Sequence, residues 1–222
     1  FKIKKIIRNR ILNKKKKNSI FVKGGGYKAF WYDLGYMSYY TKNKDIESIG
    51  GYSAGSIVAA LSLCTRSEKD EILNLCRKLV SEFKYGKLSL TIRELLEELL
   101  PEDAHDKVKN KLDILVCDPG DYFKGKMESK WSTREDLIND IVSSCYVPFI
   151  SEFRLKDGIT GYLDGGLCRD IEDIIKKYVN VVEMKGLGYI DVLRTVSSEK
   201  ALEYYEEGVE NCKEDLKNEL KK

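Results

Sequence analysis

The chain has 222 residues, enough for one domain with a sizeable core, and its 42% hydrophobic and 34% charged content excludes a disordered protein. No apolar run approaches the ~20 residues that a membrane-spanning helix requires, and no secretory signal pattern is visible. The net charge of +3 is unevenly distributed: residues 1–17 hold nine Lys or Arg and no acid, and the other 30 of the 39 basic residues accompany all 36 acidic ones.

The basic arm, residues 1–18, places four isoleucines at helical spacing among its lysines and arginines: Ile3, Ile6, Ile7 and Ile11. A basic amphipathic helix of this kind can lie on an anionic membrane surface. Two alternatives are a helix that packs against the protein before a flexible KKKKN linker, and a targeting leader. We predict peripheral membrane association through residues 1–17, and a single domain over residues 19–222.

The next part of the chain repeats one supersecondary pattern. Ile20 to Lys23 predicts a short strand, followed by three glycines and an amphipathic helix. Asp45 to Gly50 predicts a second strand, followed by a glycine-containing turn and an apolar helix from Ser56 to Cys64. Strands that alternate with glycine turns and helices predict an α/β fold with a mostly parallel sheet.

The rest of the chain continues this mixture. Ser67 to Lys111 is mainly helical in pattern, and ILVCDPGDYFKG predicts a strand that ends at a Pro-Gly turn. Residues 133–147 predict a capped helix, and two short strands are expected on either side of a turn at Asp157 and Gly158. A helix, a strand region and a charged amphipathic helix complete the chain. No repeat or domain boundary is evident.

Ser53 lies in the sequence GGYSAG, between the second strand and its helix. Gly51 and Gly55 flank it at two residues on either side, where small residues are needed for the backbone to double back. This is the nucleophile-elbow pattern, and the following helix N-terminus favours developing negative charge. The alternative is an ordinary serine in a tight strand-to-helix loop.

The proton acceptor for such a serine is not a histidine. The one histidine, His105, lies in the polar stretch PEDAHDKVKNK and is expected at the surface, so a Ser-His-Asp relay is not predicted. Asp164 is the candidate base, because it ends a predicted strand and precedes Gly165 and Gly166, which permit close approach of another backbone. The triplet alone favours an ordinary Asp-Gly-Gly turn.

Gly24, Gly25 and Gly26 follow the first strand and precede a helix. Their amides can bind an anion or an oxyanion at the helix N-terminus. A rival reading takes Gly24, Gly26 and Ala29 as a dinucleotide fingerprint, with a ribose-binding acid ~20 residues later at Asp45 or Glu47. Those acids precede the next strand instead of following it, and this reading leaves the serine and the aspartate unexplained.

Together these motifs resemble those of the patatin-like phospholipases. KGGGYKAF resembles the family's glycine-rich oxyanion motif, GYSAG its serine elbow and YLDGG its Asp-Gly-Gly motif. The segment SSCYVPF resembles the small-residue and proline segment before the Asp strand. Order and spacing agree over about residues 19–170. The resemblance implies a three-layer α/β/α fold with a mostly parallel central sheet, in which residues 19–222 form the catalytic domain.

The resemblance also implies an activity. It implies a lipid acyl hydrolase of the phospholipase A or lysophospholipase type, acting on phospholipids or other acyl lipids through a Ser-Asp dyad and an acyl-enzyme, with no metal or cofactor. Ser53 is then the nucleophile, Asp164 the base, and Gly24, Gly25 and Gly26 the oxyanion hole. Burial is expected to raise the pKa of Asp164 above the ~3.9 of a free Asp.

Two positions depart from the family pattern. Ala29 stands where the family often has Gly, and Tyr27 replaces a small residue, so it either crowds the acyl pocket or lines it. A non-catalytic lipid-binding module on the same fold is therefore the alternative. The cysteines show no metal-binding spacing and are expected to be reduced thiols of a cytoplasmic protein that binds no nucleic acid: Cys64, Cys76, Cys117, Cys145, Cys168 and Cys212.

Overall fold

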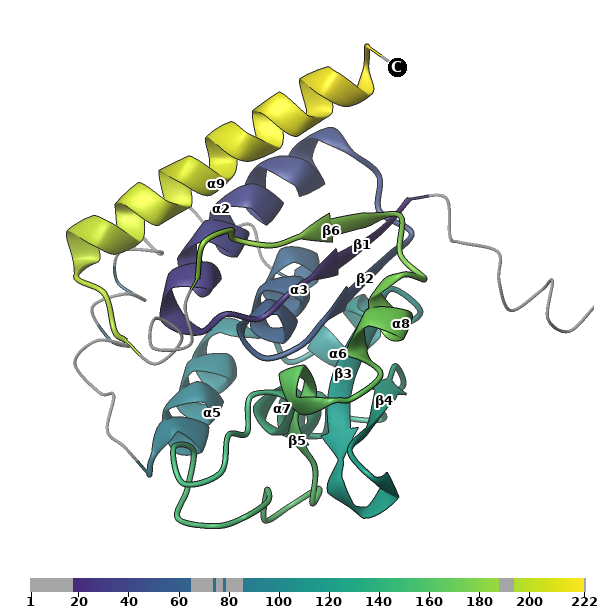
Figure 1. The fold of residues 1–222 in the computed structure, drawn as a ribbon, viewed down its shortest axis with the longest axis vertical. Helices are drawn as coiled ribbons and strands as arrows, with labels where there is room; N and C mark the ends of the chain where they lie inside the picture. Colours follow the sequence, from purple (N-terminus) through teal and green to yellow (C-terminus); the bar gives the residue numbers. More distant parts are fainter. Residues whose placement is uncertain (1–17, 65–73, 75–77, 79–85, 188–193, 222) are drawn as a thin grey trace, which may run out of the picture.

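The computed structural model describes residues 18–64, 74, 78, 86–187 and 194–221 (Figure 1). The basic arm over residues 1–17 and part of the helical segment predicted from Ser67 to Lys111 lie outside these residues, as does Cys76. None of the helices that the described residues form combines the length and the apolar character needed to cross a bilayer.

A six-stranded sheet lies at the centre of the molecule, with strand order β4–β3–β2–β1–β6 and with β5 paired to β3 (Figure 1). The pairs β1–β2, β1–β6 and β2–β3 are parallel, and β4 and β5 each pair with β3 in the antiparallel direction. The strands are β1 (Ser19–Val22), β2 (Ser48–Gly51), β3 (Leu112–Asp118), β4 (Lys124–Glu128), β5 (Leu163–Asp164) and β6 (Asn180–Val182).

Side chains on both faces of the sheet are buried. Successive side chains of a strand point to opposite faces, so neighbouring residues of β1 join different cores. Ile20 and Val22 of β1 join a large core with α2, α3, α5, α7 and α9, whereas Phe21 joins a smaller core that α8 covers. This is the predicted three-layer α/β/α arrangement. The helices are α2 (Gly26–Asn43), α3 (Ala54–Cys64), α5 (Leu88–Leu99), α6 (Ala104–Lys107), α7 (Arg134–Ser144), α8 (Ile171–Ile175) and α9 (Ser198–Glu219).

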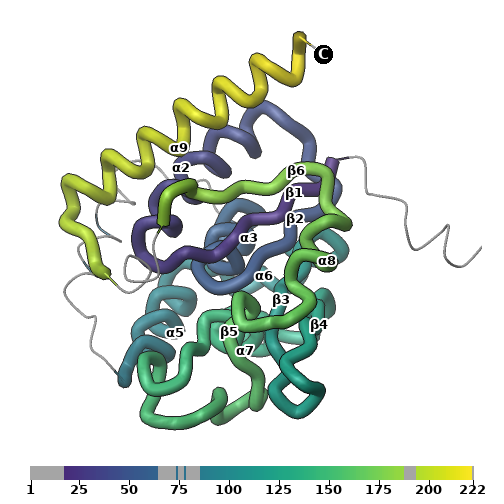
Figure 2. Tube along the Cα trace, viewed as in Figure 1, coloured from purple at the N-terminus to yellow at the C-terminus, as the bar shows by residue number. Residues whose placement is uncertain are grey.

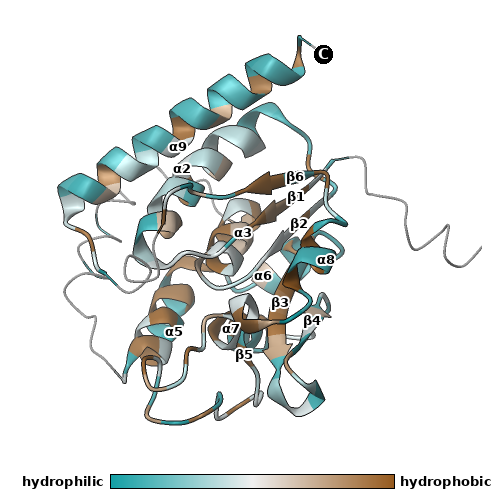
Figure 3. Cartoon of the chain, in the orientation of Figure 1, coloured by the Kyte–Doolittle hydropathy of each residue, from teal (hydrophilic) through white to brown (hydrophobic). Residues whose placement is uncertain are grey.

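Helix α9 runs along α2 in close contact (Figures 1 and 2). Gly208 of α9 faces the carbonyl of Tyr32, and Gly35 of α2 faces the carbonyl of Tyr205, so near that an added Cβ would overlap the opposing backbone. Figure 3 shows the contrast between hydrophobic strands β1, β3 and β6 and the mainly hydrophilic α9. The glycines therefore let two helix backbones approach each other, and α9 supports the helix that follows the glycine turn.

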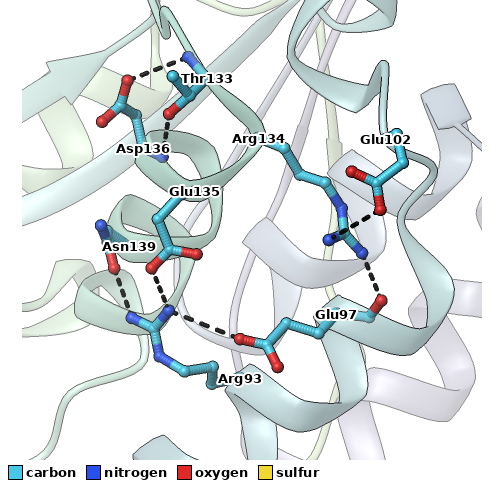
Figure 4. A network of polar contacts seen from close by, with 8 residues as sticks. All are labelled: Arg93, Glu97, Glu102, Thr133, Arg134, Glu135, Asp136 and Asn139. Carbon is cyan, nitrogen blue, oxygen red and sulfur yellow. Dashed lines mark hydrogen bonds and ion pairs between the residues drawn. The ribbon is translucent and has the colours of Figure 1, made fainter.

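Helices α5 and α7 are joined by two arginines (Figure 4). Arg134, at the start of α7, donates to the carbonyl oxygens of Glu97 and Leu100 at the end of α5. Arg93 of α5 pairs with Glu135 and Asn139 of α7. The Arg134 bonds satisfy helix-end carbonyls that would otherwise lack partners, and the bonds of both arginines join α5 to α7.

The structure differs from the sequence-based predictions at two places. The hairpin predicted around Asp157 and Gly158 is wrong: the segment forms bends and turns, because the buried Asp157 carboxylate accepts from the amides of Ile159 (3.1 Å) and Thr160 (2.6 Å). Strand β4 was not predicted, since its sequence, KGKME, lacks the apolar alternation of a half-buried strand. It pairs with β3, and a short helical turn, η1 (Pro119–Asp121), lies in the connection between the two strands.

Candidate active site

Ser53 occupies the sharp turn between β2 and α3, with a φ of 52°, a left-handed conformation that is uncommon for a residue other than glycine. A Cβ added at Gly51 would lie 2.6 Å from the carbonyl oxygen of Gly55. A Cβ added at Gly55 would overlap the carbonyl of Val22 in β1. Both flanking positions therefore require glycine for a steric reason, and the turn has the predicted elbow geometry.

Ser144, the last residue of α7, holds the elbow from behind. Its carbonyl oxygen (3.0 Å) and its Oγ (3.1 Å) both accept from the Ser53 amide, and its hydroxyl donates to the Leu115 carbonyl of β3 (2.7 Å). Ser144 was not among the predicted site residues. The small-residue pair before Cys145 was the available signal, but its role depends on a contact 91 residues distant in sequence.

Asp164 ends β5, where pairing with Val116 places it beside β3. Its amide donates to the carbonyl of Tyr146 (2.8 Å), and its Oδ1 accepts from the Gly166 amide (2.7 Å). The carboxyl group is buried beside the Ser53 side chain, which favours the charged form of Asp164, as the Gly166 amide does. Burial raises the pKa of Asp164 to about 6, against the opposing effect of these two groups.

The three sequence motifs meet around Tyr52. A Cβ added at Gly24 would lie 2.5 Å from the Cβ of Ser53 and 2.8 Å from the Tyr52 ring. The same ring lies against Gly166, and the Tyr52 Cβ lies 2.6 Å from the position of a Cβ at Gly165. Tyr52 thus separates the glycine turn from the Asp-Gly-Gly turn. No pattern in the sequence predicted this packing role of Tyr52.

The glycine turn leads into the N-terminus of α2. Gly25 is the N-cap residue and Gly26 has a φ of 67°. The first amides of a helix lack partners within that helix, so those of Gly25 and Gly26 are suited to bind an oxyanion. Gly24, one residue before the N-cap, packs against Ser53 and the Tyr52 ring, and its part in the oxyanion hole stays a prediction.

The dinucleotide reading conflicts with this geometry. In the parallel pair β1–β2, Ser19 is aligned with Ser48 and Val22 with Gly51. Asp45 precedes β2, so it lies at the edge of the sheet opposite to the glycine turn, and so does Glu47. A ribose-binding acid would be needed at the carboxyl end of β2.

An apolar cavity opens beside Ser53 and Asp164. Its volume is about 720 Å³ including the space open to solvent at its mouth. Tyr27 lines it together with Phe30, whereas Trp31 and Tyr32 pack in the core. The lining residues are Gly26, Tyr27, Phe30, Ser53, Ala54, Ile57, Leu88, Ile92, Leu95, Cys145, Val147, Ile150 and Asp164.

Neither His105 nor Cys145 competes with the Ser53–Asp164 pair. His105 lies on α6 with its side chain 23% exposed, more buried than predicted, and it is not among the residues that line the cavity. Cys145 does line the cavity, with Sγ 3.9 Å from the Ser56 Oγ. Burial raises the pKa of the Cys145 thiol, which keeps it in the protonated, weakly nucleophilic form.

Comparisons with known proteins agree with the motifs. A family model described as patatin-like phospholipase matches residues 20–172. Human patatin-like phospholipase domain-containing protein 4 is 28% identical over 135 residues, covering 56% of this chain and 53% of that protein. Mouse omega-hydroxyceramide transacylase is 32% identical over 126 residues, covering 52% of this chain and 21% of that protein.

The match therefore spans about half the length of the human relative and about a fifth of the length of the mouse relative. Among solved structures, the heterodimeric complex ExoU-SpcU from the type III secretion system of Pseudomonas aeruginosa contains a similar chain. That chain is 15% identical, with a TM-score of 0.46, and the match covers 92% of this chain and 52% of that one.

Proposed function

The chain belongs to the patatin-like phospholipase family, and from this premise we propose that it is a serine acyl hydrolase that releases fatty acids from phospholipids or related acyl lipids. The family supports a lipid hydrolase or acyltransferase function in general. The observation that carries the finer proposal is that Ser53, on its strained turn, and the buried Asp164 line the same apolar cavity.

The first half of the proposed reaction forms an acyl-enzyme. Ser53 Oγ attacks the ester carbonyl while Asp164 accepts the hydroxyl proton. The carbonyl oxygen becomes an oxyanion, which the amides of Gly25 and Gly26 stabilise by on the order of 3 kcal/mol per donor. The C–O bond to the leaving alcohol then breaks, and protonated Asp164 returns the proton to that oxygen.

The second half regenerates the enzyme. Asp164 accepts a proton from water, the water oxygen attacks the acyl carbonyl, and Ser53 leaves with the proton restored to its Oγ. An alcohol in place of water would give acyl transfer, the activity that names the transacylase relative. We propose hydrolysis as the main reaction. All of these steps use protein groups, so we expect the rate to be unchanged by EDTA.

The direct test is hydrolysis of a soluble chromogenic acyl ester. We expect activity from the wild type, none above background from Ser53→Ala, and a large loss in Asp164→Asn. Product analysis with and without an added alcohol then separates hydrolysis from acyl transfer. Wild-type protein that binds lipid but leaves the ester intact would instead support the non-catalytic lipid-binding module.

The basic arm supplies a separate membrane proposal. Residues 1–17 carry nine positive charges and no acid, which suits an anionic lipid surface. Deleting them is expected to weaken binding to anionic vesicles while the hydrolysis of a soluble ester continues. Equal vesicle binding by the shortened protein would contradict this role.

A further inference from the structure

Large apolar side chains protrude into solvent from the loop between α7 and β5, residues 145–162. Phe149, Phe153, Leu155 and Ile159 are between 58% and 78% exposed. A single exposed apolar side chain needs no explanation, but several on one short loop indicate a surface that contacts something apolar.

This loop borders the cavity that holds Ser53. Val147 and Ile150 line the cavity, and the Ile150 carbonyl accepts from the Gly86 amide (2.9 Å) just before α5. The Phe153 ring lies over Gly86, and Leu90 of α5 adds another side chain that is half exposed. The exposed apolar side chains therefore continue outward from the apolar cavity lining.

The turn between β3 and β4 adds two aromatic side chains at the same end of the molecule. Figure 1 shows this turn and the α7–β5 loop at the lower end of the view. Tyr122 and Phe123 are 79% and 47% exposed. The ammonium group of Lys126 lies 4.8 Å from the centre of the Tyr162 ring, which links the strand after this turn to the end of the loop.

Three of these aromatic residues have strained backbones. Tyr122, Phe123 and Phe149 have φ values of 51°, 58° and 66°, a conformation that is unusual for bulky side chains. Such strain persists only where the surrounding structure fixes it, and it concentrates at functional positions. The energetic cost of this backbone strain has no evident compensation if the three rings contact only water.

We propose that these side chains form an apolar rim that docks on a lipid surface and places the cavity mouth against the bilayer. The apolar rim comprises Leu90, Tyr122, Phe123, Phe149, Phe153, Leu155 and Ile159. The purpose of the rim rests on the proposed function, in which the cavity receives an acyl chain. A docked rim spares that chain exposure to water as it moves from bilayer to cavity.

The charges around the rim indicate that the rim would bind lipid through apolar contact and not through electrostatic attraction. Arg154 pairs with Glu152 and Lys124 pairs with Asp121, so these two ion pairs beside the rim carry no net charge. The rim should therefore bind zwitterionic lipid and do so with little dependence on salt, unlike the basic arm. Tyrosine and phenylalanine suit this role because their rings partition into the membrane interface.

A second copy of the chain is the other occupant to consider. A copy seated on the rim would cover the cavity mouth and block the route to Ser53, whereas a lipid surface leaves that route open to substrate. Continuity between the rim and the cavity lining therefore favours lipid. Self-association becomes an outcome of the test.

The test measures co-sedimentation with phosphatidylcholine vesicles at low and high salt. All proteins carry Ser53→Ala, so the result does not depend on whether Ser53 is the nucleophile. The rim variant is Phe153→Ser with Leu155→Ser. The matched control, Val179→Ser with Leu220→Ser, removes two side chains that are 45% and 85% exposed elsewhere on the molecule.

We expect the rim variant to reduce vesicle partitioning by about tenfold or more, and the control to have little effect. Tyr122→Gly is a second rim variant that also relieves a left-handed backbone, so reduced binding there is not caused by strain in the fold. Unchanged partitioning in both rim variants would overturn the proposal. So would a dimer of the Ser53→Ala protein, seen by sedimentation, that the rim substitutions dissociate while vesicle binding persists.

Discussion

Burial decides the chemistry of Asp164. A carboxylate is a weak base near neutral pH at its ordinary pKa, and burial raises that of Asp164 to about 6. The base form is the deprotonated one, so its population rises as pH increases through 6. We predict that kcat/KM for a soluble ester increases from pH 4, roughly tenfold per unit well below 6, and levels off above 7.

The pH profile is measured with a neutral ester whose own reactivity is subtracted at each pH. A profile that stays flat between pH 4 and 8 would contradict the assignment of Asp164 as the base. Asp164→Asn provides the control, since its residual activity should lose the step near pH 6.

Gly24 shows how one missing side chain can position a reactive group. A Cβ at this position would lie 2.5 Å from that of Ser53, so Gly24→Ala must displace the serine or the glycine turn. We predict a loss of ester hydrolysis of at least about 10²-fold. Gly120→Ala is the control, because its Cβ would meet only the Asp118 side chain, at 3.1 Å. Near-normal activity in Gly24→Ala would argue against this packing.

At the scale of elements, α7 connects the cavity wall to the elbow. Arg134 begins the helix and caps the carbonyl end of α5 (Figure 4). Ser144 ends the helix and accepts a hydrogen bond from the Ser53 amide. Helix α5 in turn supplies Ile92 and Leu95 to the cavity. Helix α7 therefore links the network at one of its ends to the elbow at the other.

Arg134→Met tests this link. It removes charged hydrogen bonds to the carbonyls of Glu97 and Leu100 while it keeps most of the apolar stem. We predict that the free energy of unfolding in urea falls by about 1.5–3 kcal/mol. Arg154→Met is the control, since the Arg154 side chain is 67% exposed. Equal effects of the two substitutions would mean that the α5 cap contributes nothing specific.

Gly208 tests the contact between α9 and α2. Alanine has a higher helix propensity than glycine, by about 1 kcal/mol, so Gly208→Ala would be stabilising if the site were open. Alanine also slightly exceeds glutamate, so the exposed control Glu207→Ala should be neutral or stabilising. At Gly208 the added Cβ would overlap the Tyr32 carbonyl, and we predict a net destabilisation of about 1–3 kcal/mol. Thermal unfolding of the two variants is the measurement, and a stabilised Gly208→Ala would show that the helices can separate at no cost.

At the scale of the whole molecule, the sequence was sufficient for the fold class. Alternating strands, glycine turns and helices predicted the α/β architecture, and the family match over residues 20–172 confirms the resemblance. The prediction of a hairpin near Asp157 was wrong because a turn pattern does not show that the buried Asp157 carboxylate accepts hydrogen bonds from amides of its own loop. Strand β4 was missed because its polar residues lie at a sheet edge, where pairing with β3 determines its conformation.

The candidate site was predictable where the chemistry is local. Ser53 and Asp164 stand in short motifs whose glycines are required by steric contact, and the structure brings the two side chains together. Ser144 and Tyr52 were not predictable, because their roles come from packing between distant segments. The catalytic roles of all of these residues remain predictions of the proposed function.

We propose that Ser53 is an activated nucleophile with Asp164 as its base. Intact-protein mass after treatment with an active-site-directed fluorophosphonate tests it most directly. We predict one adduct on the wild type, none on Ser53→Ala and slow labelling of Asp164→Asn. An unlabelled wild type, or an adduct that persists on Ser53→Ala, would contradict the claim and leave Ser53 as a serine in a tight turn.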